Sequence, residues 1–309
     1  MNSLLWIMTG DGNINIIVNG VVKLVGTDHE NYDKILAGCV AGDSNVINLI
    51  DEMKIKINNF DGVDFSIQDG ELLFRGTPYS NAVLSAKILK LIAKGFQPAP
   101  LVRFLERLEL NPNLRSREML WDFLQHNGFA ISDDGMIIGF KYVSKVSELS
   151  SDDQARLRLK YPNIVYTDQY SRKFNYSPGA TPSIPRYMID ISEDGASCGN
   201  TGLHVGTFAY VNGSAHKILV AVDPMDVASV PKSESQKLRC VRFTCLSEYN
   251  PDQLDEKGLK EPVMKIDGTK LTASEYGKQS QAAAVSRPYV SDGDEAEGQL
   301  DNESAEHWG

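Results

Sequence analysis

Residues 216–246, "HKILVAVDPMDVASVPKSESQKLRCVRFTCL", decide the fold of the C-terminal half of this chain. The apolar run "ILVAV" (218–222) shows no alternation, which is typical of a strand buried on both faces. The next segment, "DPMDVASVP" (223–231), predicts a turn and a short extended piece. Residues 237–246, "KLRCVRFTCL", alternate in polarity, as one half-buried strand does. We therefore predict a β-rich module over residues 129–265.

The first 80 residues predict a small strand–helix module. Residues 13–25, "NINIIVNGVVKLV", place apolar β-branched residues on both sides of Asn19-Gly20, a strong hairpin signal. Residues 64–76, "DFSIQDGELLFRG", repeat this pattern around Asp69-Gly70. Between the two, residues 30–42 carry apolar residues at helical spacing. Residues 1–80 are thus expected to form an N-terminal α+β module.

Three helices are expected in the middle of the chain, over residues 81–128. The first follows Ser80 as its N-cap and ends at Gly95. The second lies between prolines at 98 and 112, and the third ends at Gly128. The fold class is therefore α+β: the N-terminal module, a helical middle, a β-rich C-terminal module and a disordered acidic tail.

The tail prediction comes from composition. Residues 291–309, "SDGDEAEGQLDNESAEHWG", contain many acids, no lysine or arginine and almost no core-forming residues. Such a segment cannot bury enough apolar surface to offset the entropy of the chain. We expect the acidic disordered tail to span residues 266–309.

Charge and cysteine content narrow the function classes. The 309-residue chain has a formal net charge of −10, which argues against non-specific binding to nucleic acid. Its four cysteines show no paired framework, so we expect a reducing compartment. No stretch approaches the ~20 apolar residues of a membrane span, so we expect any membrane contact to be peripheral.

The segment "CGNTGLHVGTFAYV" (198–211) is the first candidate site. Cys198 and His204 could form a nucleophile–base pair, oriented by Asp190 or Asp194. In the structural alternative the glycines shape a tight loop, and His204 is a partly buried histidine. The spacing matches no nucleophile elbow, so the structural interpretation is favoured.

Two other kinds of site could include this segment. Cys198, His204, Cys240 and Cys245 would supply a zinc ligand set, but Cys240 and Cys245 point to opposite faces of one strand, so no metal is predicted. Basic residues could instead gather near His204 and bind an anion or a nucleotide phosphate, with only one of Arg239 and Arg242 facing it. These basic residues are Arg186, Lys237, Arg239 and Arg242.

Four segments together resemble one protein family. They are "RFLERLELNPNLRSREMLWDFLQHNGFAISDDGMIIGFKYV" (103–143), "FNYSPGATPSIPRYMID" (174–190), "CGNTGLHVGTFAYV" (198–211) and "ILVAVDPMDVASVPKSESQKLRCVRFTCLSEY" (218–249). Their content and order resemble the phage rIIB-like (rapid-lysis) family. The motif residues are Pro185, Arg186, Cys198, Gly202, Leu203, His204, Pro224, Asp226, Val227, Pro231 and Arg239.

The resemblance implies an early-expressed phage accessory protein that affects lysis timing and overcomes host exclusion or other host defences. It implies action in the host cytoplasm, beside an rIIA-like phage protein at the inner face of the membrane, with a host defence protein as a further candidate partner. It supplies no established catalytic residue and no cofactor. His204, Cys198 and Arg239 are thus catalytic candidates by motif membership only, and a non-enzymatic protein that does not bind nucleic acid is favoured. The alternative is a nucleotide-binding or hydrolase-like enzyme centred on Cys198, His204 and Arg239.

Overall fold

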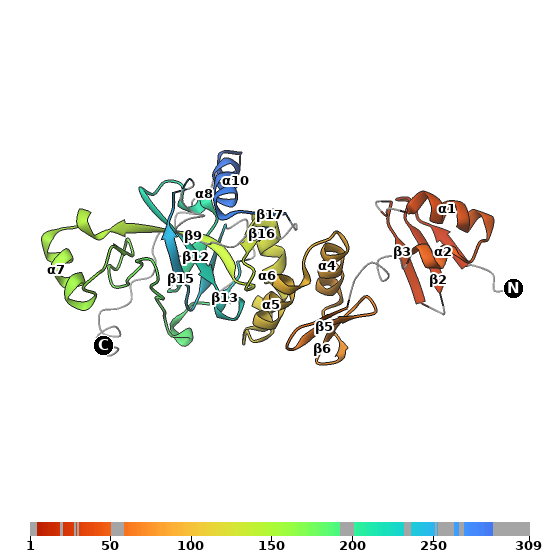
Figure 1. The fold of residues 1–309 in the computed structure, drawn as a ribbon, viewed down its shortest axis with the longest axis horizontal. Helices are drawn as coiled ribbons and strands as arrows, with labels where there is room; N and C mark the ends of the chain where they lie inside the picture. The colour runs from red at the N-terminus through yellow and green to blue at the C-terminus, as the bar shows by residue number, and fades with distance from the viewer. Residues whose placement is uncertain are drawn as a thin grey trace. The chain divides into compact units, whose positions relative to one another are not determined.

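The computed structural model describes residues 5–18, 21–27, 29, 31–50, 59–191, 201–231, 236–250, 252, 263–265 and 269–286. The chain divides into two compact units, Met1–Phe96 and Gln97–Gly309 (Figure 1). This division differs from the expected boundaries at residues 80 and 128. Helix α4 (Ala82–Ala93) contacts strand β6 (Glu71–Phe74) of the first unit, whereas the two following helices contact elements of the second unit.

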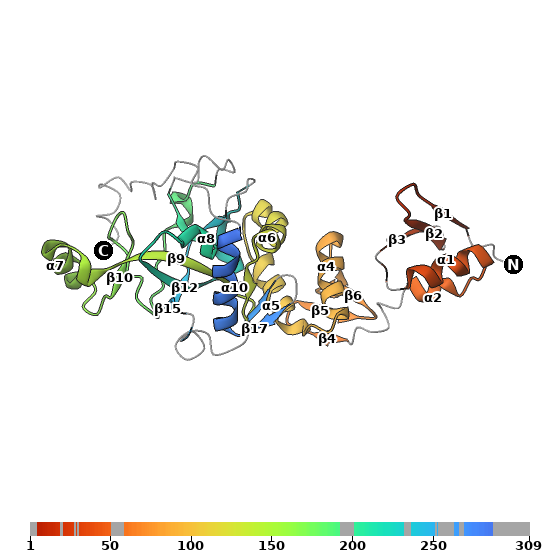
Figure 2. The same cartoon turned by 90° about the horizontal axis from the view of Figure 1, so that it is seen from above.

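The first unit begins with a three-stranded antiparallel sheet in the order β1-β2-β3. Its strands are β1 (Leu5–Met8), β2 (Ile14–Val18) and β3 (Val21–Val25). Helices α1 (Tyr32–Ala41) and α2 (Val46–Ile50) cover one face of the sheet, as Figure 2 shows. Ile14, Ile16 and Val25 form a core with α1 and α2 on that face. The β2–β3 hairpin and α1 confirm the sequence prediction, and β1 is an additional strand.

The same unit contains a four-stranded sheet, β4-β5-β6-β7. Its strands are β4 (Phe60–Asp61), β5 (Phe65–Gln68), β6 (Glu71–Phe74) and β7 (Thr77–Pro78). The predicted turn is confirmed, because Asp69 and Gly70 both have positive φ, at 50° and 72°. The N-cap of α4 is Asn81 rather than Ser80. Its side chain accepts a hydrogen bond from the backbone N–H of Leu84 at 3.0 Å.

The second unit is built around one long strand, β9 (Ile137–Lys145). Strand β12 (His216–Val222) pairs with β9 along residues 137–143. Strands β8 (Ala130–Ile131) and β11 (Leu203–Gly206) pair with its other edge, and β10 (Tyr166–Thr167) pairs with its end. The sheet continues through β14 (Lys237–Cys240) to β13 (Val227–Ser229), while β15 (Thr244–Glu248) pairs with β12. Residues 218–222 of β12 are buried throughout, as predicted for a strand covered on both faces.

Helices and short turns complete this unit. They are α5 (Pro98–Glu109), α6 (Leu114–Asn127), η1 (Val146–Glu148), α7 (Ser151–Lys160), η2 (Arg186–Met188), α8 (Phe208–Val211) and η4 (Pro224–Asp226). Among the described residues, no helix is both long and apolar enough to cross a membrane. Helices and antiparallel sheets together confirm the α+β class.

Two sequence predictions are wrong in the second unit. Residues 237–246 form two strands instead of one, because the chain leaves β14 at residue 240 and joins β12 through β15. Residues 269–286 are not a disordered tail, since β17 (Lys270–Leu271) pairs with β16 (Val263–Lys265) and is followed by helix α10 (Ala273–Ser286). Helix α10 packs Tyr276 onto Phe140 with stacked rings 5.7 Å apart. The acidic residues 287–309 lie outside the described part of the chain.

Candidate functional site

The "DPMDV" turn is the point at which several motif residues meet. Arg186, which follows the motif proline Pro185, donates hydrogen bonds to the carbonyls of Met225 at 2.7 Å and Val227 at 3.5 Å. The buried Asn111, after α5, donates to the carbonyls of Pro224 and Val227, each at 2.8 Å. These bonds satisfy buried carbonyls that a turn would otherwise leave unpaired. The turn thus joins the α5–α6 corner, η2 and the sheet.

The two carboxylates of this turn are engaged in the same junction. Asp223 pairs with Arg107 of α5 and accepts the N–H of Met225 at 3.0 Å. Asp226 accepts a hydrogen bond from Nε of Arg242 at 2.9 Å, and the ion pair brings Nη2 of Arg242 within 2.8 Å of the same carboxylate oxygen. Both carboxylates are buried, and burial lowers the pKa of the neighbouring Arg186. Asp223 and Asp226 are therefore both engaged in contacts that hold the turn.

A second meeting point lies between β11 and β14. His204 stands directly opposite Arg239, and each side chain is 2% exposed. Directly opposite residues of an antiparallel pair share one face of the sheet. Arg239 donates a hydrogen bond to the backbone carbonyl of Asp190, and its Nη1 lies 3.7 Å from Asp190 Oδ2. Asp190, one of the two carboxylates expected to orient His204, thus contacts Arg239.

The surroundings of His204 favour its neutral form. Burial lowers the pKa of His204 well below its ordinary value, and the charges of Lys141, Lys237 and Arg239 lower it further. Lys141 is fully buried on β9, with its Nζ 5.6 Å from the centre of the Tyr176 ring. Chemically, this region combines a neutral imidazole with three cationic side chains.

The predicted cationic group is only partly assembled. Lys237 and Arg239 lie near His204, whereas Arg186 and Arg242 bind the "DPMDV" turn. Arg239 and Arg242 are thus separated, but strand parity is not the reason, because Arg239 lies on β14 and Arg242 lies between β14 and β15. Cys198 lies outside the described residues, so the structure does not place the proposed nucleophile.

The cysteines near this strand pair are buried thiols. Cys240 donates to the carbonyl of the motif residue Leu203 at 3.3 Å, and burial raises its pKa. Burial also raises the pKa of Cys245 to about 12. Within the described ranges, no group of three or more His, Cys, Asp or Glu side chains could hold a metal ion.

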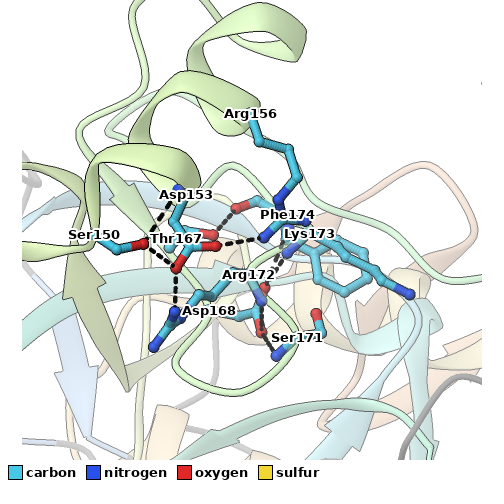
Figure 3. Close-up of polar contacts among 9 residues, drawn as sticks. All are labelled: Ser150, Asp153, Arg156, Thr167, Asp168, Ser171, Arg172, Lys173 and Phe174. Atoms are coloured by element: carbon cyan, nitrogen blue, oxygen red, sulfur yellow. Dashed lines mark hydrogen bonds and ion pairs between the residues drawn. The ribbon is translucent and has the colours of Figure 1, made fainter.

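Sequence reasoning missed a polar cluster that follows β10 (Figure 3). The buried Asp168 carboxylate accepts hydrogen bonds from four consecutive backbone N–H groups. These belong to Ser171, Arg172, Lys173 and Phe174, at 2.5, 2.9, 2.8 and 3.2 Å. Arg172 has φ of +53°, so the carboxylate holds a tight turn of the backbone. An aspartate at the end of a strand, followed by a polar loop, was the available signal.

Asp153 of α7 fixes this loop to the helix. It accepts a hydrogen bond from Arg156 at 2.9 Å and pairs with Arg172 of the loop, as Figure 3 shows. Helix α7 lies at the end of the second unit away from α5 and α6 (Figures 1 and 2). Its outer surface exposes Leu159, at 89%, between two exposed cations, Arg158 and Lys160. We call α7 with the 168–174 loop the α7 protrusion.

Comparisons with known proteins show the same family resemblance as the sequence motifs. The sequence profile of the family described as Bacteriophage T4 protein rIIB matches residues 3–253. Protein rIIB of Enterobacteria phage T4 is 26% identical over 223 residues, which cover 71% of this chain and 64% of the T4 protein. The chain thus matches less than two thirds of that relative's length, and no solved structure matches it. Because the family profile matches residues 3–253 of the 309-residue chain, the chain belongs to the Bacteriophage T4 protein rIIB family.

Proposed function

We propose that this chain is a phage accessory protein that affects lysis timing and overcomes host exclusion, and that it acts through protein partners near the inner face of the host membrane. The observation that carries the proposal is family membership over residues 3–253. An rIIA-like phage protein is the first candidate partner, and a host defence protein is the second. Action through partners requires an exposed recognition surface, rather than a set of buried motif residues.

The α7 protrusion is the surface that best fits this role. Leu159 is almost fully exposed, although a leucine on a helix normally packs inward. Arg158 and Lys160 flank it, and the rigid loop beside it carries Lys173 and the exposed Tyr170. Apolar and aromatic side chains surrounded by cations suit a protein partner with an acidic rim.

The test is genetic complementation in the phage. Deleting the reading frame should reduce plating on a restrictive host, leave plating on a permissive host intact and change plaque size. Supplying the wild-type chain should restore all three phenotypes. Equal plating of the deletion phage on both hosts, with normal plaques, would contradict the proposed function.

A variant tests the surface itself. Leu159→Glu should fail to restore plating on the restrictive host, because a charge replaces the apolar contact. Val83→Glu, at another largely exposed aliphatic position, is the matched control and should restore it. Restoration by Leu159→Glu at wild-type protein level would exclude the α7 protrusion as the partner surface.

The neutral His204 beside Arg239 supports a second candidate, an anion-binding or hydrolytic site for nucleotides. Its test is isothermal titration of the full chain with nucleoside triphosphates, together with an assay of phosphate release. Binding or hydrolysis lost in Arg239→Gln, with the chain still folded by circular dichroism, would favour an enzyme. If neither a heat of binding nor released phosphate is detected, a nucleotide-binding or hydrolytic site is excluded for these substrates.

A further inference from the structure

The outer face of the β1–β3 sheet is apolar and exposed. The register pairs Leu5 with Ile17 and Ile17 with Val22, and it places Ile7 and Leu24 on the two sides of Asn15. Directly paired residues share a face, so these six residues form one surface. Its five aliphatic side chains are between 44% and 65% exposed. We call this surface the outer sheet face.

This arrangement departs from the usual pattern of an antiparallel sheet. The opposite face already forms a core with α1 and α2 through Ile14, Ile16 and Val25. A sheet with one covered face normally presents polar side chains to water. The β4–β7 sheet of the same unit follows this rule, since Phe65 and Ile67 are buried while Gln68 and Glu71 are exposed.

The outer sheet face has none of the features that keep exposed sheets apart. It carries no charged residue and no proline, and Asn15 is its single polar member. Its register runs without a bulge from β1 to β3. Natural sheets usually rely on charges, prolines or bulges to prevent association. An exposed apolar surface without charges is typical of an interaction site.

We propose that the outer sheet face is a self-association surface, on which the same face of a second copy of this chain docks. Two such sheets can pack face to face at the ordinary sheet separation of about 10 Å. The absence of charge argues against a strongly charged partner surface, because its charges would find no opposite charge on this face and would be desolvated without compensation. An identical face meets this condition and allows a symmetric, closed dimer.

The size of the face sets the expected strength. Five aliphatic side chains exposed to this extent offer on the order of 400 to 500 Å² per copy. Two copies together would bury about 800 to 1,000 Å², which is the size of a weak or transient interface. The dimer should therefore be weak and dependent on concentration, with dissociation in the micromolar range.

Sedimentation-velocity centrifugation of the full chain between 1 and 200 µM tests the proposal. The wild-type chain should shift from monomer to dimer across this range. Val22→Lys/Leu24→Lys should remain monomeric, because it would bury four lysines without partners in each dimer. Circular dichroism and the melting temperature should stay close to wild type, since both side chains already face solvent.

The matched control is Val40→Lys/Val83→Lys. It adds the same charge at two aliphatic positions that are 72% and 66% exposed on helices of the same unit. This control should dimerise like the wild type. A wild-type chain that stays monomeric to 200 µM would overturn the proposal and leave the face to another protein. A dimer that persists in Val22→Lys/Leu24→Lys, or that is lost equally in the control, would overturn it as well.

Discussion

Gly202 lies directly against the side chain of Arg239. A Cβ atom built on Gly202 would come within 3.1 Å of Arg239 Cδ and 3.3 Å of Ile189 Cγ2. Gly202 has φ of +157°, a conformation that favours glycine. The glycine that begins the "GLHV" motif therefore makes room for the buried arginine of the "KLRC" motif.

Substituting Gly202 should destabilise the second unit. Gly202→Val is expected to cost about 1–3 kcal/mol, because it combines backbone strain with a clash against Arg239. Urea denaturation followed by circular dichroism measures this loss. Gly213→Val is the control, since no atom lies within 4 Å of its added Cβ. Equal stability of the two variants would show that Arg239 can move aside.

The buried His204 should make stability depend on pH. Its folded pKa is well below the unfolded value near 6.5, so below pH 6.5 the unfolded chain binds a proton that the folded chain does not. Its contribution to stability is therefore complete above pH 6.5 and falls as the pH drops, by up to about 1.4 kcal/mol per pH unit. Urea denaturation between pH 5 and 8 should show a shallower dependence in His204→Gln. His126→Gln controls for the loss of an exposed imidazole, and identical slopes in wild type and His204→Gln would contradict the prediction.

Neutralising Asp168 should loosen the α7 protrusion. Asp168→Asn replaces one acceptor oxygen by an amide that faces backbone N–H groups, so a loss of about 2–3 kcal/mol is expected. Hydrogen exchange of the amides at residues 171–174 should accelerate, while exchange in β9 and β12 stays slow. The control is Asp152→Asn at an exposed position in the first turn of α7, which should cost less than about 1 kcal/mol. Unchanged protection of the loop in Asp168→Asn would refute the role of the carboxylate.

Helix α10 should be required for stability. Tyr276 is 2% exposed, and its hydroxyl donates to the carbonyl of Ile138 at 3.1 Å. Tyr276→Ala is expected to cost about 3–5 kcal/mol through the cavity it leaves. Thermal unfolding compares it with Val285→Ala on the exposed side of the same helix, which should stay within about 0.5 kcal/mol of wild type. A small effect of Tyr276→Ala would mean that α10 adds little to the core.

Local signals predicted several elements correctly. Asn19-Gly20 and Asp69-Gly70 identified their hairpins, because two-residue turns of this type need residues that tolerate positive φ. The unbroken apolar run 218–222 identified a strand buried on both faces, because such a strand needs apolar side chains at successive positions. Each of these patterns spans only a few neighbouring residues, and the interactions that cause it are local as well.

Long-range effects account for the errors. Residues 237–246 alternate like one strand, but β14 pairs with β11 and β13 while β15 pairs with β12, so the chain changes partners at residues 241–243. Cys240 and Cys245 were expected on opposite faces of one strand, and this reasoning does not apply because the two residues lie on β14 and β15. Helix α10 has a weak local pattern, and its position depends on Phe140, more than 130 residues earlier in the chain.

The α+β class, the hairpins, the main buried strand and the family could all be predicted from the chain, because turn chemistry, hydrophobic periodicity and motif order are local or linear properties. The contacts of the motif residues depend instead on which distant strands pair. Arg186 and Asp226 hold the "DPMDV" turn, and His204 faces Arg239, because strands distant in sequence pair in this register. The same is true of the outer sheet face, since the pairing of β1, β2 and β3 decides that five aliphatic side chains share one exposed surface.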